Sequence, residues 1–162
     1  MLKYFGTCYL ARTEVPPTAE PVLRIMAQSP VNILVTAPNG YRVGYHYQTE
    51  TMVNEIAGAT YSGPGTEPQV VNIPSPLPGA YIVDVIGIGT GTYTIQMESV
   101  AEDGSLTDTT AWTDTTTPGQ LDTTDIQLSE SGTFEDTQPP LVGVPEIPFD
   151  LIMLMRAQTK AD

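Results

Sequence analysis

Residues 77–87 read LPGAYIVDVIG, and this stretch decides the fold. A Pro-Gly pair supplies turn chemistry, and a run of β-branched and aromatic residues follows at once. The alternation places Tyr81, Val83 and Val85 on one face, because burying the intervening Asp84 would be costly. We therefore predict a strand with one buried face and one wet face.

Two other stretches follow the same pattern. Residues 29–40 read SPVNILVTAPNG, an apolar run that ends in a strong turn signal, and residues 92–98 read TYTIQME, a strict alternation. Turn signals separate similar runs between residues 21 and 128. These patterns predict an all-β fold, an antiparallel β-sandwich (immunoglobulin-like or jelly-roll-like) of about seven to nine strands with extended terminal arms. The expected core comprises Ile33, Val35, Val83, Val85, Tyr93, Ile95 and Met97.

The chain has 162 residues, enough for one domain with a substantial core, and its 15 prolines and 14 glycines indicate many short elements. We divide it into an N-terminal arm (1–20), a sandwich domain (21–128), a Pro-rich acidic linker (129–148) and a C-terminal apolar arm or strand (149–162). The only cysteine, Cys8, excludes an intrachain disulfide. No signal peptide is visible in the first ten residues, so export would require a signal on a longer parent chain.

The formal net charge is −13, and no lysine or arginine occurs between Arg42 and Arg156. Such a surface repels phosphate backbones and anionic lipid headgroups. No run approaches the roughly 20 apolar residues of a membrane helix. We therefore expect no nucleic-acid partner and no membrane insertion.

Three motifs together resemble a known family. They are VNILVTAPNG at 31–40, PGAYIV at 78–83 and GTYTI at 91–95. This series resembles the β-sandwich accessory modules of bacterial secreted proteins, including the pre-peptidase C-terminal type. In those modules a strand ending in D-P-N-G precedes a P-G-x-Y strand and a G-x-Y-T strand. The resemblance implies a non-catalytic module of an extracellular or cell-surface bacterial assembly; Asn32 and Ala37 stand where the family often has Asp.

Residues suited to catalysis are scarce. His46 is the only histidine, and it lies in a predicted strand between two tyrosines, where we assign it a structural or surface role. Cys8 has no basic neighbour in the sequence that would lower its pKa. We expect no enzymatic activity and no cofactor.

Calcium is the metal that the acidic second half of the chain suits best, because Ca²⁺ requires about six to eight oxygen ligands. We name as candidate ligands Glu102, Asp103, Asp122 and Asp125. Their spacing fits no EF-hand, and the Asp-Gly pair at 103–104 is also explained by a turn.

Carbohydrate binding requires exposed aromatic rings with polar neighbours. Tyr41, Tyr45 and Tyr47 lie two or four residues apart in a predicted strand, so they should share one face. Trp112, among threonines, is the other candidate, and these four residues form the expected glycan site. Packing of the three tyrosines into the core is the alternative that we favour.

The apolar run at 149–155 has three interpretations: a last strand of the same sandwich, a strand donated to a neighbour, or an exposed tail. Exposure is the least favoured, because a free apolar β-prone strand promotes aggregation. Donation would make the chain a self-assembling subunit joined by strand addition, whose partners are other protein modules or copies of itself. The candidate assembly residues are Phe149, Leu151, Ile152, Met153, Leu154 and Met155.

Overall fold

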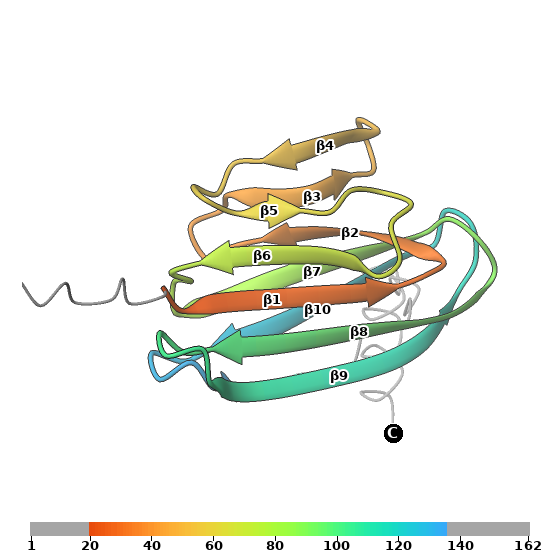
Figure 1. Ribbon diagram of the computed structural model, residues 1–162. Helices are drawn as coiled ribbons and strands as arrows, with labels where there is room; N and C mark the ends of the chain where they lie inside the picture. Colours follow the sequence, from red (N-terminus) through yellow and green to blue (C-terminus); the bar gives the residue numbers. More distant parts are fainter. Residues whose placement is uncertain (1–19, 136–162) are drawn as a thin grey trace, which may run out of the picture.

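The structure is a computed structural model and describes residues 20–135. Two antiparallel sheets pack face to face (Figure 1), and no helix occurs in this range, so none that could span a membrane. The strands are β1 (Val22–Gln28), β2 (Val31–Thr36), β3 (Arg42–His46), β4 (Thr51–Asn54), β5 (Thr60–Tyr61), β6 (Gln69–Pro74), β7 (Gly79–Gly87), β8 (Gly91–Val100), β9 (Leu106–Thr116), β10 (Leu121–Leu128) and β11 (Phe134–Glu135).

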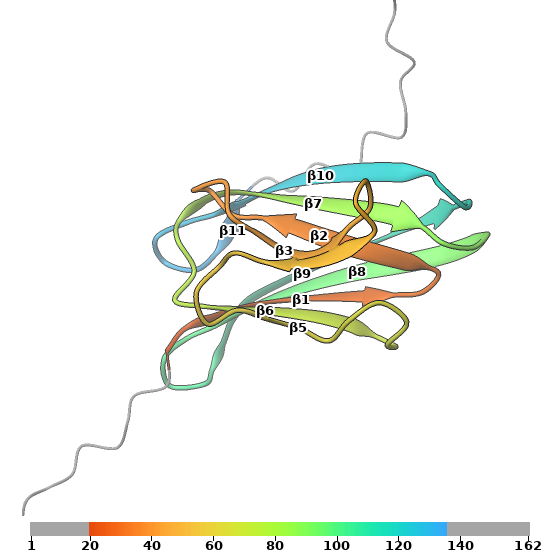
Figure 2. The same ribbon diagram turned by 90° about the horizontal axis from the view of Figure 1, so that it is seen from above.

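Sheet A has the order β5-β6-β1-β8-β9, and sheet B has the order β11-β10-β7-β2-β3-β4. Figure 2 shows the two layers from above, with β10, β7 and β2 of sheet B in the upper part of the picture and β1, β6 and β5 of sheet A in the lower part. The chain crosses between the two sheets from β1 to β2, from β4 to β5, from β6 to β7, from β7 to β8 and from β9 to β10. The predicted antiparallel β-sandwich is therefore confirmed.

Two details differ from the expectation. The described strands number eleven, above the expected seven to nine, because β5 and β11 are two-residue strands that a sequence pattern cannot mark. Sheet B also continues past Leu128, where we placed the domain end, since Phe134 pairs with Leu128 and Glu135 pairs with Gln127.

The core lies between the sheets and contains all seven residues expected there, each at most 1% exposed. Tyr81, Val83 and Val85 of β7 are buried, while Ile82 and Asp84 between them face outward. Strand β8 shows the same alternation. The period-two patterns of these strands thus confirm the predicted inward faces.

One buried side chain links the two sheets by hydrogen bonds. Gln69 of β6 is 1% exposed, and its Nε2 donates to the carbonyl oxygen of Val31 at 2.6 Å and to Oδ1 of Asn32 at 2.9 Å. Its Oε1 accepts from the hydroxyl of Tyr61 at 2.6 Å. Strand β3 pairs with β2 only from Leu34 onward, so Gln69 satisfies a β2 carbonyl beyond the end of that pairing.

The buried tyrosines make stability sensitive to alkaline pH. Burial raises the pKa of Tyr81 to about 12, although a hydrogen bond to Leu77 opposes the shift. Burial also raises the pKa of Tyr61 and Tyr93, and the negative charge of Asp122 adds to the effect on Tyr93. A tyrosine with a raised folded pKa contributes its full stabilisation below the unfolded pKa of about 10 and loses it as the pH rises through the folded value.

We therefore expect the free energy of unfolding to fall between about pH 10 and pH 12. Denaturant melts at successive pH values, together with ultraviolet titration of tyrosinate, measure this loss. Tyr81→Phe should flatten the slope, whereas Tyr41→Phe, at a side chain that is 55% exposed, should leave it unchanged. Equal slopes for the two variants would contradict the assignment to Tyr81.

Candidate interaction surface

One side of the sandwich is bounded by strands with open edges. Strand β9 has 11 residues and, within residues 20–135, pairs only with β8. In the neighbouring strand of the other sheet, β10, the last two residues pair with β11, and the described part of the chain gives the rest of β10 no outer partner. Exposed backbone N–H and C=O groups on such edges are templates for pairing with another chain.

Two aspartates of β9 bind backbone amides of the residues that follow them. Asp108 Oδ1 accepts from the N–H of Thr109 at 2.8 Å, and Asp114 Oδ1 accepts from the N–H of Thr115 at 2.7 Å. Gln120 Nε2 donates to the carbonyl of Thr115 at 3.3 Å. Side chains therefore form hydrogen bonds with the backbone of β9 at two residues, Thr109 and Thr115, which lie six positions apart.

The position of these bonds shows which residues of β9 face the open edge. Backbone groups of an antiparallel strand alternate between its two sides. Because the amides of Thr109 and Thr115 bind side chains, the odd-numbered residues of β9 direct their N–H and C=O groups away from β8. Ala111 and Thr113 therefore present their backbone groups to the edge, between the two occupied amides.

The face of β9 that points toward the other sheet is partly polar. Asp108, Thr110, Trp112 and Asp114 of β9 are half-buried, whereas the residues between them are exposed. Trp112 packs against the core, and its buried Nε1 has no hydrogen-bond partner in the described part of the chain. Asp108 Oδ2 also accepts from the N–H of Phe134 at 2.8 Å, which anchors β11 beside β9.

A buried carboxylate lies near the start of β10, the strand of sheet B that neighbours β9. Asp122 of β10 is 3% exposed, and its Oδ2 accepts from the hydroxyl of Tyr93 at 3.0 Å. Gln120 Nε2 donates to both oxygens of Asp122, at 3.0 and 3.2 Å. Neutral donors therefore satisfy this carboxylate, as buried polar groups require.

The four acids expected as calcium ligands do not come together, which corrects that expectation. Glu102 and Asp103 follow the end of β8, whereas Asp122 lies beside Tyr93 near the start of the same strand. Asp125 is exposed on the outer face of sheet B. Between residues 20 and 135, no three His, Cys, Asp or Glu side chains are grouped so that they could hold a metal ion.

Asp103 instead stabilises the turn between β8 and β9. Its Oδ1 accepts from the N–H of Ser105 at 2.9 Å and from the Ser105 hydroxyl. These bonds lower the pKa of Asp103, and the bond to the hydroxyl contributes most. The turn that the Asp-Gly pair suggests is therefore present.

The aromatic residues expected to form a glycan platform are also dispersed. Strand β3 spans Arg42–His46, so Tyr41 and Tyr47 lie outside it. Tyr41 is exposed, Tyr45 and Tyr47 are half-buried, and Trp112 belongs to β9 at the far end of the other sheet. The structure therefore brings these four residues into no common platform, and it also corrects the expectation that all three tyrosines pack in the core.

His46 takes part in local contacts at the turn after β3. Its ring stacks on Tyr47 at 6.1 Å between centroids and 13° between planes. Its Nδ1 lies 3.0 Å from the hydroxyl oxygen of Thr49 and accepts from the Thr49 N–H at 3.3 Å. These contacts agree with the structural role expected for this histidine.

Tyr41 borders a hollow of about 310 Å³ at one end of the sandwich. Leu77, 46% exposed, and the half-buried Ile56 contribute apolar surface to this hollow, and Asn39 and Glu55 contribute polar groups. An aromatic ring beside apolar and polar groups is the usual composition of a small-molecule site.

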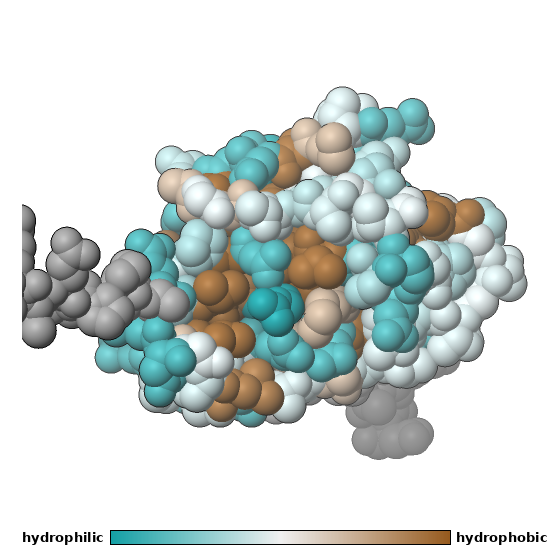
Figure 3. Space-filling view, in the orientation of Figure 1, coloured by the Kyte–Doolittle hydropathy of each residue, from teal (hydrophilic) through white to brown (hydrophobic). Residues whose placement is uncertain are grey.

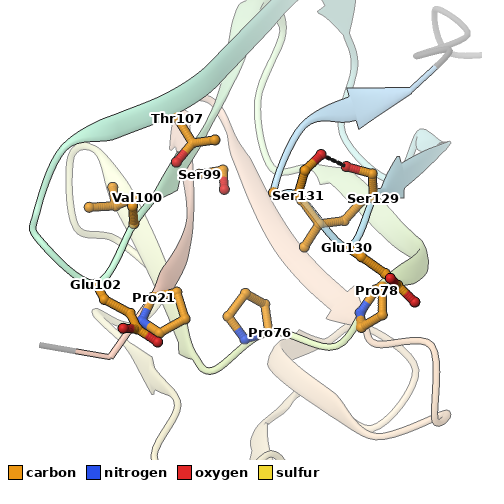
Figure 4. Close-up of a pocket in the computed structure, with 13 residues that line it drawn as sticks. Pro21, Pro76, Pro78, Ser99, Val100, Glu102, Thr107, Ser129, Glu130 and Ser131 are labelled. Carbon is orange, nitrogen blue, oxygen red and sulfur yellow. Dashed lines mark hydrogen bonds between the residues drawn. The ribbon is translucent and has the colours of Figure 1, made fainter. Parts of the chain in front are cut away.

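A second hollow, of about 230 Å³, lies between the β8–β9 turn and the β10–β11 turn. Figure 4 shows Pro21, Pro76 and Pro78 along one wall, with Ser99 and Thr107 opposite. The hydroxyls of Ser129 and Ser131 in the wall lie 2.8 Å apart and bond to each other. Among the described residues, Glu102 and Glu130 also line this hollow, and the hydroxyl of Ser129 lies 2.7 Å from that of Thr133 within the β10–β11 turn.

The described residues contain two basic side chains, Arg24 and Arg42, and both form ion pairs. Arg24 Nη1 lies 3.3 Å from Glu98 Oε2, and Arg42 Nη2 lies 2.9 Å from Glu55 Oε1. The face of sheet A is a mixture of polar and apolar residues, and its lower edge, where β9 runs, is polar over most of its length (Figure 3). The β9–β10 side therefore carries carboxylates without basic partners.

Sequence reasoning missed Asp108 and Asp114, although a signal for them exists. The sequence Asp-Thr-Thr occurs at 108–110 and again at 114–116. An even spacing of six in a strand places both carboxylates on one face and both following amides on one edge.

The candidate assembly residues at 149–155 lie outside the described residues. Comparisons of the chain with protein-family models, with curated proteins and with solved structures give no match, so the geometry alone carries the functional argument.

Proposed function

We propose that the chain is a non-catalytic structural or binding module of an exported or cell-surface bacterial assembly. It joins other protein chains, copies of itself included, by strand addition. The observation that carries this proposal is the open edge of β9, which presents the backbone groups of Ala111 and Thr113 on an 11-residue strand. Main-chain hydrogen bonds to such an edge are the basis of peptide recognition by β-augmentation.

Two features of the sequence support the same role. The three motifs that resemble accessory modules of secreted proteins favour an exported location. The apolar residues at 149–155 supply a β-prone segment that is better buried than exposed. The open edge of β9 would receive the segment 149–155 of another copy. Repetition of that contact between copies produces a ring or a filament.

Light scattering of the full-length chain and of a chain lacking residues 149–162 tests this proposal. We expect the full-length protein to exceed the monomer mass in a concentration-dependent manner and the shortened protein to remain a monomer. Circular dichroism of both proteins confirms that the sandwich is intact. If both proteins have the monomer mass up to high concentration, strand donation is wrong.

Carbohydrate binding is a second candidate, and the exposed ring of Tyr41 beside Leu77 favours it. The test is a titration with a panel of glycans, observed by the fluorescence of Trp112 and by calorimetry. Binding that Tyr41→Ala abolishes would support a site in this hollow. Binding that survives Tyr41→Ala would place the site elsewhere, and no heat with any glycan would remove this candidate.

A further inference from the structure

We propose that the receiving edge is β9 between Thr109 and Thr115, and that its occupant is the segment Phe149–Met155 of a second copy of this chain. Asp108 and Asp114 restrict pairing to this window. This inference rests on the proposed function and specifies where, and with what, the strand addition takes place.

The window is defined by the hydrogen bonds of the two aspartates. The carboxylates hold the amides of Thr109 and Thr115, and within residues 20–135 nothing pairs with the edge-facing backbone groups of Ala111 and Thr113, which an incoming strand could therefore meet. A strand longer than the window has to displace a charge-assisted hydrogen bond at either end. Charged residues on an edge strand are a known protection against unlimited pairing, so β9 favours a short partner.

The occupant matches the window in length and polarity. Residues 109–115 and residues 149–155 are both seven residues long. Trp112, whose side chain packs against the core, lies between Ala111 and Thr113 and offers apolar surface on the inner face. A segment that contains phenylalanine, leucine, isoleucine and methionine buries its apolar side chains there while its backbone pairs with β9.

A basic residue of the chain itself can supply a local charge partner for the window. The two basic residues of the described part are engaged with Glu98 and Glu55. The remaining four basic residues, at positions 3, 12, 156 and 160, lie outside the described residues. One of them, Arg156, directly follows the apolar segment and is suited to pair with Asp108 at the end of the window.

The length of the chain between the last described strand and the segment allows a second copy to be reached. Thirteen residues, four of them proline, separate Glu135 from Phe149, and a spacer of that length has a maximum reach of about 40 Å. Phe134 is bonded to Asp108 of its own β9, and Trp112 is four residues further along, about 14 Å away in a strand. The reach therefore covers a neighbouring copy as well as the chain's own window, and the mass of the protein with protected amides decides between the two.

Amide hydrogen exchange on the full-length protein tests the window directly. We expect the amides of Ala111 and Thr113 to exchange more slowly in the assembled full-length protein than in the chain lacking 149–162, by about tenfold or more. The amides of β4, an edge strand of the other sheet, serve as the internal control and should exchange equally in both proteins.

Asp114→Ala tests whether the aspartates limit the length of β9 that can pair. This variant is preferred to a change at Asp108, because Asp108 also bonds to Phe134 of β11. We expect it to strengthen association by about tenfold, because the N–H of Thr115 is released from the carboxylate and becomes able to pair with the incoming strand. Asp125→Ala removes the same charge at an exposed position and should have little effect. Equal effects of both variants would show simple charge reduction and overturn the role of Asp114.

The outcomes separate this inference from the proposed function. If removal of 149–162 dissociates the assembly while exchange at Ala111 and Thr113 is unchanged, strand donation stands and β9 is the wrong edge. If these amides are protected in a full-length monomer, the segment pairs within its own chain and the inference is wrong. If the full-length protein neither assembles nor protects these amides, both proposals fail.

Discussion

Gln69→Leu is expected to lower the free energy of unfolding by about 3 kcal/mol or more. The leucine fills a similar volume, but it leaves the carbonyl of Val31, the side chain of Asn32 and the hydroxyl of Tyr61 without their partners. Each buried polar group that loses its partner costs about 1–3 kcal/mol. The effect is large because one amide satisfies all three groups across both sheets.

Chemical denaturation observed through the fluorescence of Trp112 measures this loss. The matched control is Gln127→Leu, the same chemical change at an exposed position of β10, where we expect a change within about 0.5 kcal/mol. A loss below about 1 kcal/mol for Gln69→Leu would mean that water or rearrangement replaces the amide.

Gly44→Ala should destabilise the fold by a similar amount, about 3 kcal/mol. Gly44 has a φ of +131°, which L-residues rarely adopt. A Cβ at this position would also collide with the carbonyl oxygen of Ile33 and lie 3.0 Å from the Cα of Leu34. Both neighbours are backbone atoms of the central strand β2, so they cannot move aside without disturbing the core.

Gly40→Ala is the control that separates these two causes. Gly40 also has a positive φ, +83°, but a Cβ there meets no atom within 4 Å. We expect this variant to lose only about 1 kcal/mol, the conformational part of the effect. Equal losses in the two variants would show that the close approach to β2 contributes nothing.

The strands with a strict period were predictable. In β7 and β8 large apolar or aromatic residues occupy the inward positions Tyr81, Val83, Val85, Tyr93, Ile95 and Met97, because both strands lie inside their sheets and face the opposite layer. Tyr81 and Tyr93 follow this rule although each carries a hydroxyl, since a local partner is available to each. The sequence therefore predicts the middle of the sandwich well.

The edges of the sandwich were not predictable by the same rule. The inward residues of β9 lie where the two layers part, so aspartate and threonine occupy positions that are apolar elsewhere. Asp122, expected to bind calcium, is instead a buried acceptor for Tyr93. Gln69 gives no signal in sequence, because its burial depends on a gap between β2 and β3 that only the folded chain creates.

The hollow bordered by both Pro21 and the turn at Ser129–Gly132 has a mechanical consequence. It places the first and last described strands at one end of the sandwich, so tension between the flanking segments acts from a single end. Such tension opens the two residue pairs between β10 and β11 first, because β1 is held by both β6 and β8. The C-terminal edge of sheet B therefore yields to traction before the N-terminal strand does.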